Sequence, residues 1–317
     1  MKMLLKQKNK TVKVNIINFT PNTNIEICIY ENENELKNIF KNSKHGKEYN
    51  IIETINEKHD KGTYIIKSNE NNIKYILKIR HNTYSNTFEK DICSILKYHQ
   101  HKNIIKFVDF NQENEFYYFI YEYFEGSNLL DYIKQKKDLP EKQIKNILIQ
   151  ITRGTRFLHT YNIIHCDLKL DNIIINQKNE VKIIDFDLSI ISNNNDGYIS
   201  DEIFGTMQYI APESYDLCVY SKKTDVWQIG ILLYILITCQ FPHQNEITLI
   251  NSFSNLCRQN LFKHIDFNIP RTIIFEKHFD ESSYALLENM LSFTDTKRYT
   301  VDEILASKWI NKEKIDL

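Results

Sequence analysis

Hydrophobic and polar residues alternate over short stretches in the first half of the chain. Alternation with a period of two is typical of strands that bury one face. It marks five stretches after residue 48: Tyr49–Ile55, Thr63–Lys67, Ile73–Arg80, Ile105–Phe110 and Tyr117–Tyr123. One stretch with helical spacing, about Phe88–Tyr98, interrupts them. The pattern therefore predicts a small β-rich unit that contains a single helix.

After Gly126 the spacing of apolar residues becomes mostly helical. The clearest helix is predicted to begin near Asp138, an N-cap residue with Glu141 three residues on. One face of this helix carries Ile144, Ile147, Leu148 and Ile151. The longest apolar run, Ile229–Cys239, is too short to span a bilayer and predicts a buried core helix. Together the patterns indicate an α+β protein with a β-rich lobe followed by a larger α-helical lobe.

The ends of the chain differ from this central region. Alternation at Val12–Ile16 and at Ile25–Ile29 is compatible with a small hairpin, and a poorly ordered arm is the alternative. We therefore expect an N-terminal extension over residues 1–46, a domain over residues 47–311 and a short tail over residues 312–317.

Composition narrows the class of protein. Only seven of 317 residues are Gly, which excludes collagen-like and linker chains, and 42% hydrophobic residues can form a sizeable core. Forty basic and 41 acidic residues leave a net charge of −1, so we expect neither a nucleic-acid surface nor a membrane anchor. Six scattered cysteines without a C-x-x-C pair predict a reducing compartment, the cytoplasm or the nucleus.

Candidate chemistry is concentrated in four short motifs that follow one another in order. They are His165–Asn172 (HCDLKLDN), Asp185–Asp187 (DFD), Gly205–Thr206 and Ala211–Glu213 (APE). This ordered set resembles the catalytic segments of eukaryotic protein kinases. The resemblance covers about Tyr49 to Ile310, and it implies the bilobal protein-kinase fold, ATP and Mg²⁺ as cofactors and a protein as substrate.

The resemblance also implies roles for individual side chains. Asp167 would accept the proton of the substrate hydroxyl, and Lys169 would lie near the γ-phosphate, as in Ser/Thr kinases. Asn172 and Asp185 would offer the hard oxygen ligands that Mg²⁺ prefers. Lys78, in a segment that resembles the V-A-I-K strand, would pair with the α- and β-phosphates.

The remaining expected nucleotide contacts follow from the same resemblance. They are Ile55, Gly62, Tyr64, Tyr121, Glu122 and Phe124, with Tyr121 as a bulky gatekeeper before the hinge. The acid that pairs with Lys78 is open between two candidates. One inserted residue in the alignment selects Asp91, which we choose, whereas Glu89 needs a larger insertion.

Three positions depart from the family pattern. The phosphate loop, Ile55–Gly62, lacks the first two glycines of G-x-G-x-x-G, so we expect weakened ATP binding. Asp187 replaces the Gly of D-F-G and predicts a stiffer switch between active and inactive states. Cys166 replaces the Arg that often clamps a phosphorylated activation loop, so we expect activity without phosphorylation of Ser192, Tyr198 or Ser200.

Segments after the catalytic motifs extend the resemblance. Glu213 is expected to pair with Arg298, and Asp225 to brace the catalytic loop from a core helix. The residues around Gly205–Glu213 are similar to those of calcium-dependent protein kinases, although no EF-hand motif is present. The sequence therefore predicts a protein serine/threonine kinase. The alternative is a pseudokinase that acts as a scaffold or binding module, because its phosphate loop and DFD motif are altered.

Overall fold

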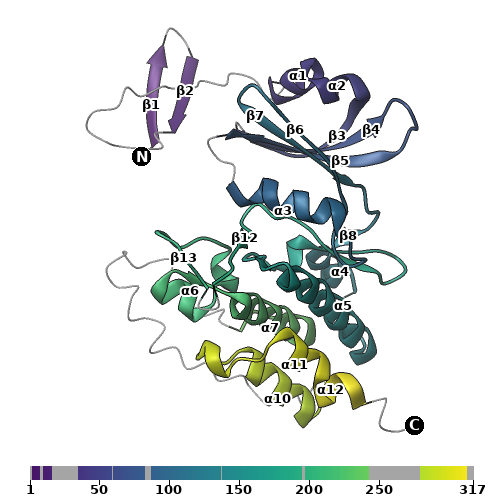
Figure 1. Ribbon diagram of the computed structural model, residues 1–317, viewed down its shortest axis with the longest axis vertical. Coiled ribbons are helices and arrows are strands. Elements are labelled where there is room, and N and C mark those ends of the chain that lie inside the picture. Colours follow the sequence, from purple (N-terminus) through teal and green to yellow (C-terminus); the bar gives the residue numbers. More distant parts are fainter. Residues whose placement is uncertain are drawn as a thin grey trace. The chain divides into compact units, whose positions relative to one another are not determined.

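The computed structural model describes residues 2–7, 10–15, 35–58, 60–82, 87–136, 138–194, 197–242 and 279–312. The chain divides into two compact units (Figure 1). The first contains residues 1–81 and 111–118, and the second contains residues 82–110 and 119–317.

A hairpin lies at the start of the chain. Its strands, β1 (Lys2–Gln7) and β2 (Lys10–Asn15), are antiparallel, with Gln7 opposite Lys10. The alternating residues from Val12 therefore belong to a hairpin, but their partner strand precedes them. The other segment considered for the hairpin, Ile25–Ile29, lies outside the described residues.

A five-stranded sheet follows two short helices, α1 (Glu35–Asn42) and α2 (Lys44–Glu48). Its strands lie in the order β3-β4-β5-β7-β6. The bounds are Tyr49–Lys58 for β3, Lys61–Ser68 for β4, Lys74–His81 for β5, Phe107–Glu113 for β6 and Phe116–Glu122 for β7. All five predicted strands are present, and the predicted β-rich first part of an α+β protein is confirmed.

Helices build most of the second unit (Figure 1). Their bounds are Thr87–Tyr98 (α3), Leu129–Lys136 (α4), Glu141–Thr160 (α5), Pro212–Leu217 (α6), Lys222–Thr238 (α7), Glu281–Met290 (α10), Val301–Ala306 (α11) and Lys308–Asn311 (α12). The prediction that α5 is capped by Asp138 is wrong. Its N-cap is Pro140, whose φ of −58° already suits the helix entrance, so the helix begins at Glu141.

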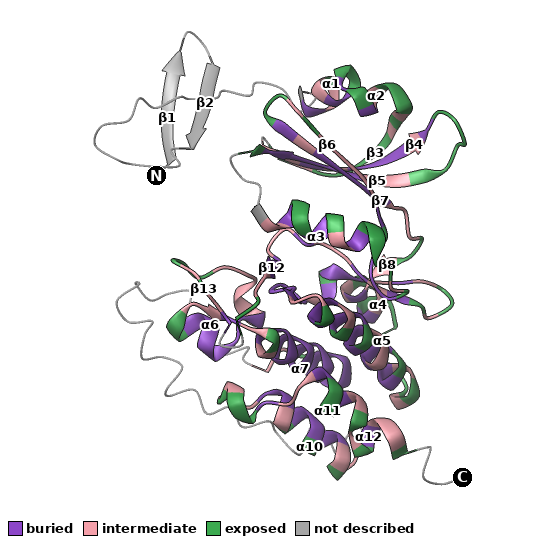
Figure 2. Cartoon of the chain, in the orientation of Figure 1, coloured by how far each residue is buried: buried purple, intermediate pink, exposed green. Residues whose placement is uncertain are grey.

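Helix α7 is the core of this unit. Every residue from Thr224 to Thr238 is buried, and Figure 2 shows the helix in the colour of buried residues. A capping box between Ser221 and Thr224 fixes its first turn. The prediction of a buried core helix is confirmed. In the described part of the chain, no helix combines the length and apolarity needed to cross a membrane.

Short two- and three-residue strands connect these helices and position the loops between them. They are β8 (Ser127–Asn128), β9 (Ile163–Ile164), β10 (Ile173–Ile175), β11 (Val181–Ile183), β12 (Ile190–Ile191), β13 (Tyr198–Ile199) and β14 (Val219–Tyr220). Pairing of β9 with β12 holds the entry to the HCDLKLDN loop beside the segment that follows the DFD motif. Pairing of β10 with β11 holds the end of that loop beside the segment that precedes the DFD motif.

Candidate active site

One carboxylate organises the HCDLKLDN loop, which we call the catalytic loop. Asp167 is 5% exposed, and its Oδ2 atom lies 2.7 Å from Lys169 Nζ. The Thr206 hydroxyl donates a 2.6 Å hydrogen bond to Asp167 Oδ1 and accepts one of 2.8 Å from Lys169 Nζ. The Asn172 amide donates to Asp167 Oδ2 at 3.0 Å. The structure therefore gathers the predicted base, cation and amide ligand into one cluster.

This cluster suits a group that takes a proton from a hydroxyl. A general base has to lie roughly 2.6–3.2 Å from the atom that gives the proton. The Thr206 hydroxyl shows that Asp167 accepts a hydroxyl hydrogen bond within that range. Lys169 holds a positive charge at the same place, where it can balance charge on a phosphoryl group in transfer.

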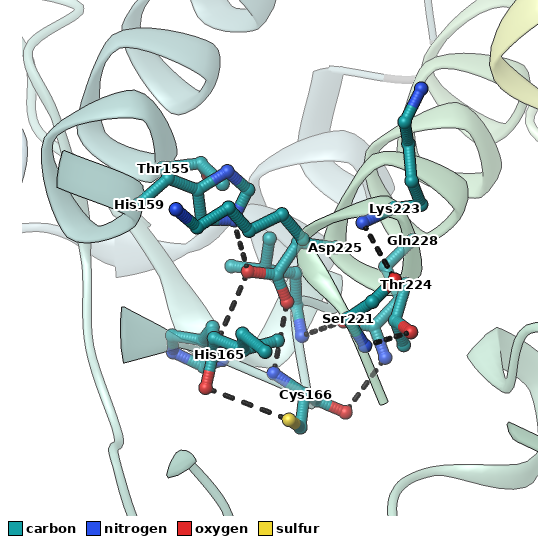
Figure 3. A network of polar contacts seen from close by, with 12 residues as sticks. Thr155, His159, His165, Cys166, Ser221, Lys223, Thr224, Asp225 and Gln228 are labelled. Carbon is teal, nitrogen blue, oxygen red and sulfur yellow. Dashed lines mark hydrogen bonds and ion pairs between the residues drawn. The ribbon is translucent and has the colours of Figure 1, made fainter. Parts of the chain in front are cut away.

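Two side chains of α7 hold the backbone of the catalytic loop (Figure 3). The Asp225 carboxylate accepts hydrogen bonds from the N–H groups of His165 at 3.0 Å and Cys166 at 2.9 Å. Gln228 donates to the Cys166 carbonyl at 2.7 Å and accepts from the Leu168 N–H at 2.8 Å. Cys166 has a left-handed φ of 64°, which costs a non-Gly residue about 1–2 kcal/mol. The bonds on both sides of Cys166 offset that strain.

The role expected for Asp225 is thus confirmed, whereas the role of Gln228 was missed by sequence reasoning. A signal was available, because Gln228 follows Asp225 by three residues within a predicted helix. Residues at this spacing share one face of a helix, so a polar side chain there is placed to reach the same loop as Asp225.

The two expected metal ligands lie on neighbouring segments. The Ile184 N–H donates to the Asn172 carbonyl at 2.9 Å, which brings Asp185 beside Asn172. Because the Asn172 amide nitrogen bonds to Asp167, its Oδ1 oxygen is the atom that can bind a metal. Among the described residues, no three His, Cys, Asp or Glu side chains gather as a metal site. Two protein oxygens nonetheless fit Mg²⁺, which keeps several waters and takes phosphate oxygens.

The expected nucleotide residues of the first unit lie on β3, β4 and β5. Lys78 is buried, with 8% exposure, and Ile55 is 54% exposed. Tyr64 is fully buried, and a Cβ on Gly62 would lie 2.3 Å from the Tyr64 hydroxyl oxygen. Burial, reinforced by the Glu57 carboxylate, raises the pKa of Tyr64. A side chain at Gly62 would therefore displace the buried ring of Tyr64, a constraint that the motif alone does not reveal.

The expected gatekeeper lies near the end of β7 and is buried. The Tyr121 hydroxyl lies 3.2 Å from Cys93 Sγ and donates to Glu89 Oε1 at 3.4 Å. Burial, together with Cys93 and Glu89, raises the pKa of Tyr121. Tyr121 is therefore a core residue with a polar end, linked to helix α3.

The two hinge residues that follow the gatekeeper both contact Lys182. The Glu122 carboxylate lies 2.7 Å from Lys182 Nζ and also accepts a 2.8 Å hydrogen bond from the Lys106 N–H. The same ammonium group lies 5.3 Å from the centre of the Phe124 ring. These contacts fix the hinge side chains.

Burial along α3 separates the two candidate acids. Asp91 lies on the exposed face of the helix, whereas Glu89 is 1% exposed on the buried face. The two candidates thus differ in burial, and the choice of Asp91 as the partner of Lys78 stays a prediction.

An apolar cluster replaces the arginine that is absent at position 166. Cys166 is 1% exposed and packs with Ile164, Ile190 and Tyr220, against which Phe88, Tyr198 and Phe204 also pack. The Phe88 and Tyr198 rings meet edge to face at 5.9 Å. Burial, together with the carboxylates of Asp225 and Asp167, raises the pKa of the Cys166 thiol well above its ordinary value. The thiol therefore acts as a small apolar group.

Two stacked rings of this cluster, Phe204 and Tyr220, also hold the segment after the DFD motif in place. The Phe204 and Tyr220 rings stack with their centres 3.9 Å apart. The Tyr220 hydroxyl accepts from the Phe204 N–H at 2.7 Å and donates to the Phe204 carbonyl at 2.8 Å. Pairing of β13 with β14 places Tyr198 opposite Tyr220. The segment is thus held by its ring contacts and by hydrogen bonds between Tyr220 and the Phe204 backbone.

The expected ion pair after the APE motif is present. Arg298 Nη1 donates to Glu213 Oε1 at 2.7 Å, and Nη2 donates to Oε2 at 2.9 Å. Both side chains are buried, and the guanidinium carbon lies 5.1 Å from the centre of the Trp227 ring. A bidentate pair of this kind fixes orientation as well as distance. It anchors α6 to the segment that precedes α11.

Comparison with known proteins agrees with this geometry. The chain is 30% identical over 69% of its length to a probable serine/threonine-protein kinase KIN1 homolog of Enterocytozoon bieneusi, and 32% identical over 68% to calcium-dependent protein kinase 4 of Plasmodium berghei. It is 31% identical over 66% to serine/threonine-protein kinase PLK1 of Xenopus laevis. The aligned parts cover 33% to 39% of those relatives. The protein kinase domain family matches residues 35–310, and the chain therefore belongs to the protein kinase family.

Proposed function

We propose that the protein transfers the γ-phosphate of ATP to Ser or Thr hydroxyls of protein substrates, with Mg²⁺. The observation that carries this proposal is the cluster of Asp167, Lys169, Asn172 and Thr206. It combines a hydroxyl-accepting carboxylate with a neighbouring cation and an amide oxygen for metal. Phosphoryl transfer requires chiefly such positioning and charge balance.

The described side chains divide the work of transfer between them. Asp167 orients the substrate hydroxyl and receives its proton, while Asn172 and Asp185 would hold Mg²⁺. When bound with ATP, Mg²⁺ supplies charge neutralisation at the phosphates. Lys169 balances charge near the attacking oxygen, and Lys78 on β5 is the residue proposed for the α- and β-phosphates.

The phosphate loop is the part of the proposed site that is expected to weaken ATP binding. Strands β3 and β4 pair as far as Lys58 opposite Lys61, with Glu57 opposite Gly62. Side chains occupy positions where the family has two of its glycines, so we expect a raised KM for ATP while the cluster around Asp167 still supports turnover. The proposed compartment is the cytoplasm or the nucleus, because the described cysteines form no disulfide.

The test compares the wild-type chain with Asp167→Asn. Each protein is incubated with Mg²⁺, ATP and a generic protein substrate, and phosphate incorporation is measured. We expect incorporation by the wild type and a loss of at least about 100-fold in Asp167→Asn, since a positioned base contributes roughly 10²–10⁴-fold. Unfolding temperature with and without Mg·ATP is measured in parallel. No incorporation and no nucleotide-dependent shift by the wild type would instead support the scaffold alternative.

A further inference from the structure

Helix α1 packs against the five-stranded sheet within the first unit (Figure 1). Its Leu36 and Phe40 side chains are buried, and the centres of the Phe40 and Tyr118 rings lie 5.8 Å apart. The turn after the helix is also held, because the Lys44 N–H donates a 2.9 Å hydrogen bond to Glu113 Oε2 at the end of β6. Helix α1 therefore has a fixed place on the sheet.

One side chain of α1 reaches the phosphate loop. Lys37 Nζ lies 3.7 Å from Glu57 Oε2 on β3. Both side chains are partly shielded from water, since Lys37 is 34% exposed and Glu57 is 15% exposed. Within the described ranges, neither of them forms an ion pair with any other side chain. The pair thus links the helix to the strand that enters the loop.

Strand pairing places Glu57 on the face of the sheet opposite to Lys78. Residues that are directly opposed in an antiparallel pair project to the same face, and successive residues of a strand alternate between faces. Glu57 is opposite Gly62, whereas Lys78 is opposite Thr63. Because Gly62 and Thr63 are neighbours, the two pairs project to opposite faces. The Glu57 carboxylate is therefore turned away from the face that carries Lys78.

The surroundings of Tyr64 agree with this placement of Glu57. Tyr64 follows Gly62 by two residues, so both project to one face. Burial raises the pKa of Tyr64, and the negative charge of Glu57 raises it further, which requires the two side chains to be close. Lys37, Glu57 and Tyr64 thus lie together on the face of the sheet that α1 contacts.

The face on which Glu57 lies decides what its charge does. A carboxylate on the nucleotide face would repel the phosphates of ATP. On the other face, beside the Lys37 ammonium group, the same charge is balanced and ties β3 to α1. The loop lacks two of the glycines that let a backbone approach phosphate closely, so it depends on other contacts to keep its position.

We propose that Lys37 is a positioning residue for the phosphate loop, which it holds through Glu57 from the face away from the nucleotide, and that this hold lowers the KM for ATP. The effect on KM rests on the proposed kinase function. The hold of α1 on β3 is a property of the first unit alone and can be measured without nucleotide.

The direction of one change in KM tests where the carboxylate lies. Glu57→Gln removes the charge and keeps the size of the side chain. The KM for ATP should rise about two- to fivefold in Glu57→Gln and in Lys37→Gln, because a partly exposed ion pair contributes up to a factor of about five. The kcat should stay within about twofold of the wild type. A lower KM in Glu57→Gln would show that the carboxylate faces the phosphates and would overturn the proposal.

Two further variants separate the ion pair from general effects of substitution. Lys41 is exposed one turn further along α1, and Lys41→Gln should leave the KM unchanged. Lys37→Glu places like charges together and should raise the KM at least as much as Lys37→Gln does. The exchanged pair, Lys37→Glu with Glu57→Lys, should return the KM to within about twofold of the wild type. An exchanged pair with a KM as high as that of Lys37→Glu alone would contradict the proposal.

Hydrogen exchange in the nucleotide-free full chain measures the hold without phosphate transfer. Exchange at residues 56–58 and 61–63 should be about two- to fivefold faster in Lys37→Gln than in the wild type and in Lys41→Gln, with exchange in β5 unchanged. Equal exchange in all three proteins would overturn the proposal, whether or not the wild type transfers phosphate. Faster exchange in Lys37→Gln, combined with no transfer by the wild type, would support the hold and count against the kinase function alone.

Discussion

The carboxylate of Asp225 is expected to hold the catalytic loop in its working shape, and Asp225→Asn tests this. The side chain is fully buried and accepts three hydrogen bonds, from the N–H groups of His165 and Cys166 and from His159 Nε2 at 2.8 Å. Asparagine keeps the size of the side chain but loses its charge. It also presents an NH₂ group to at least one of these donors, which then has no acceptor.

The magnitude follows from these contacts. A buried donor that loses its acceptor costs about 1–3 kcal/mol, and hydrogen bonds to a charged group are worth about 1.5–3 kcal/mol against about 1 for neutral ones. Loss of one bond and weakening of the others give a decrease of about 3 kcal/mol in the free energy of unfolding. For a chain of this size, 1 kcal/mol corresponds to roughly 2–4 °C, so the unfolding temperature should fall by about 6–12 °C. The catalytic rate should fall as well, because Cys166 is no longer held at its left-handed φ.

Urea unfolding and steady-state kinetics on the same preparations measure the two effects. Asp131→Asn is the matched control, because Asp131 is exposed on α4 and lies 3.9 Å from Lys134. Exposed pairs of this kind contribute about 0–1 kcal/mol. If Asp225→Asn unfolds within about 1 kcal/mol of the wild type and keeps its kcat, the charge of Asp225 does not hold the loop, and the reasoning is wrong.

Three further predictions concern the segment between the DFD and APE motifs. Because apolar packing at Cys166 replaces a phosphate clamp, phosphatase-treated protein should keep its activity, and a large loss on that treatment or in Ser200→Ala would refute this. Asp187→Gly should speed backbone exchange of the DFD segment measured by relaxation dispersion, since Gly adopts unusual φ values more easily; equal exchange in both proteins would contradict the expected stiffness. Glu213→Gln should lower the free energy of unfolding by about 3–5 kcal/mol in urea, since the Arg298 guanidinium stays buried without its carboxylate, and a change below about 1 kcal/mol would argue against the pair.

The local hydrophobic patterns predicted which helices and strands are present better than they predicted where each one begins and ends. Alternation placed all five strands of the sheet, yet the strand predicted at Ile105–Phe110 begins at Phe107. The Ile105 N–H instead donates to the Ile183 carbonyl, and Ile104 bridges to Ile183. These residues are as apolar as a strand requires, but they pair with a segment almost eighty positions away. A local pattern carries no information about that partner, so the boundary could not be read from it.

The ordered motifs predicted the centre of the site because each requires a particular residue type. Asp167, Lys169 and Asn172 meet as the resemblance to protein kinases implied. The choice between Asp91 and Glu89 could not be made in the same way. Both are acids on one helix, and only the packing of that helix distinguishes its exposed face from its buried face.

Gly62, the glycine that the chain keeps from the motif, is constrained by a second feature of the structure besides phosphate binding. As the last glycine of the phosphate loop, it was expected to preserve part of a turn for phosphate. In the structure, the fully buried Tyr64 ring occupies the place that a Gly62 side chain would need. Tyr64 therefore constrains this position by packing alone, so the glycine has a role that does not depend on nucleotide.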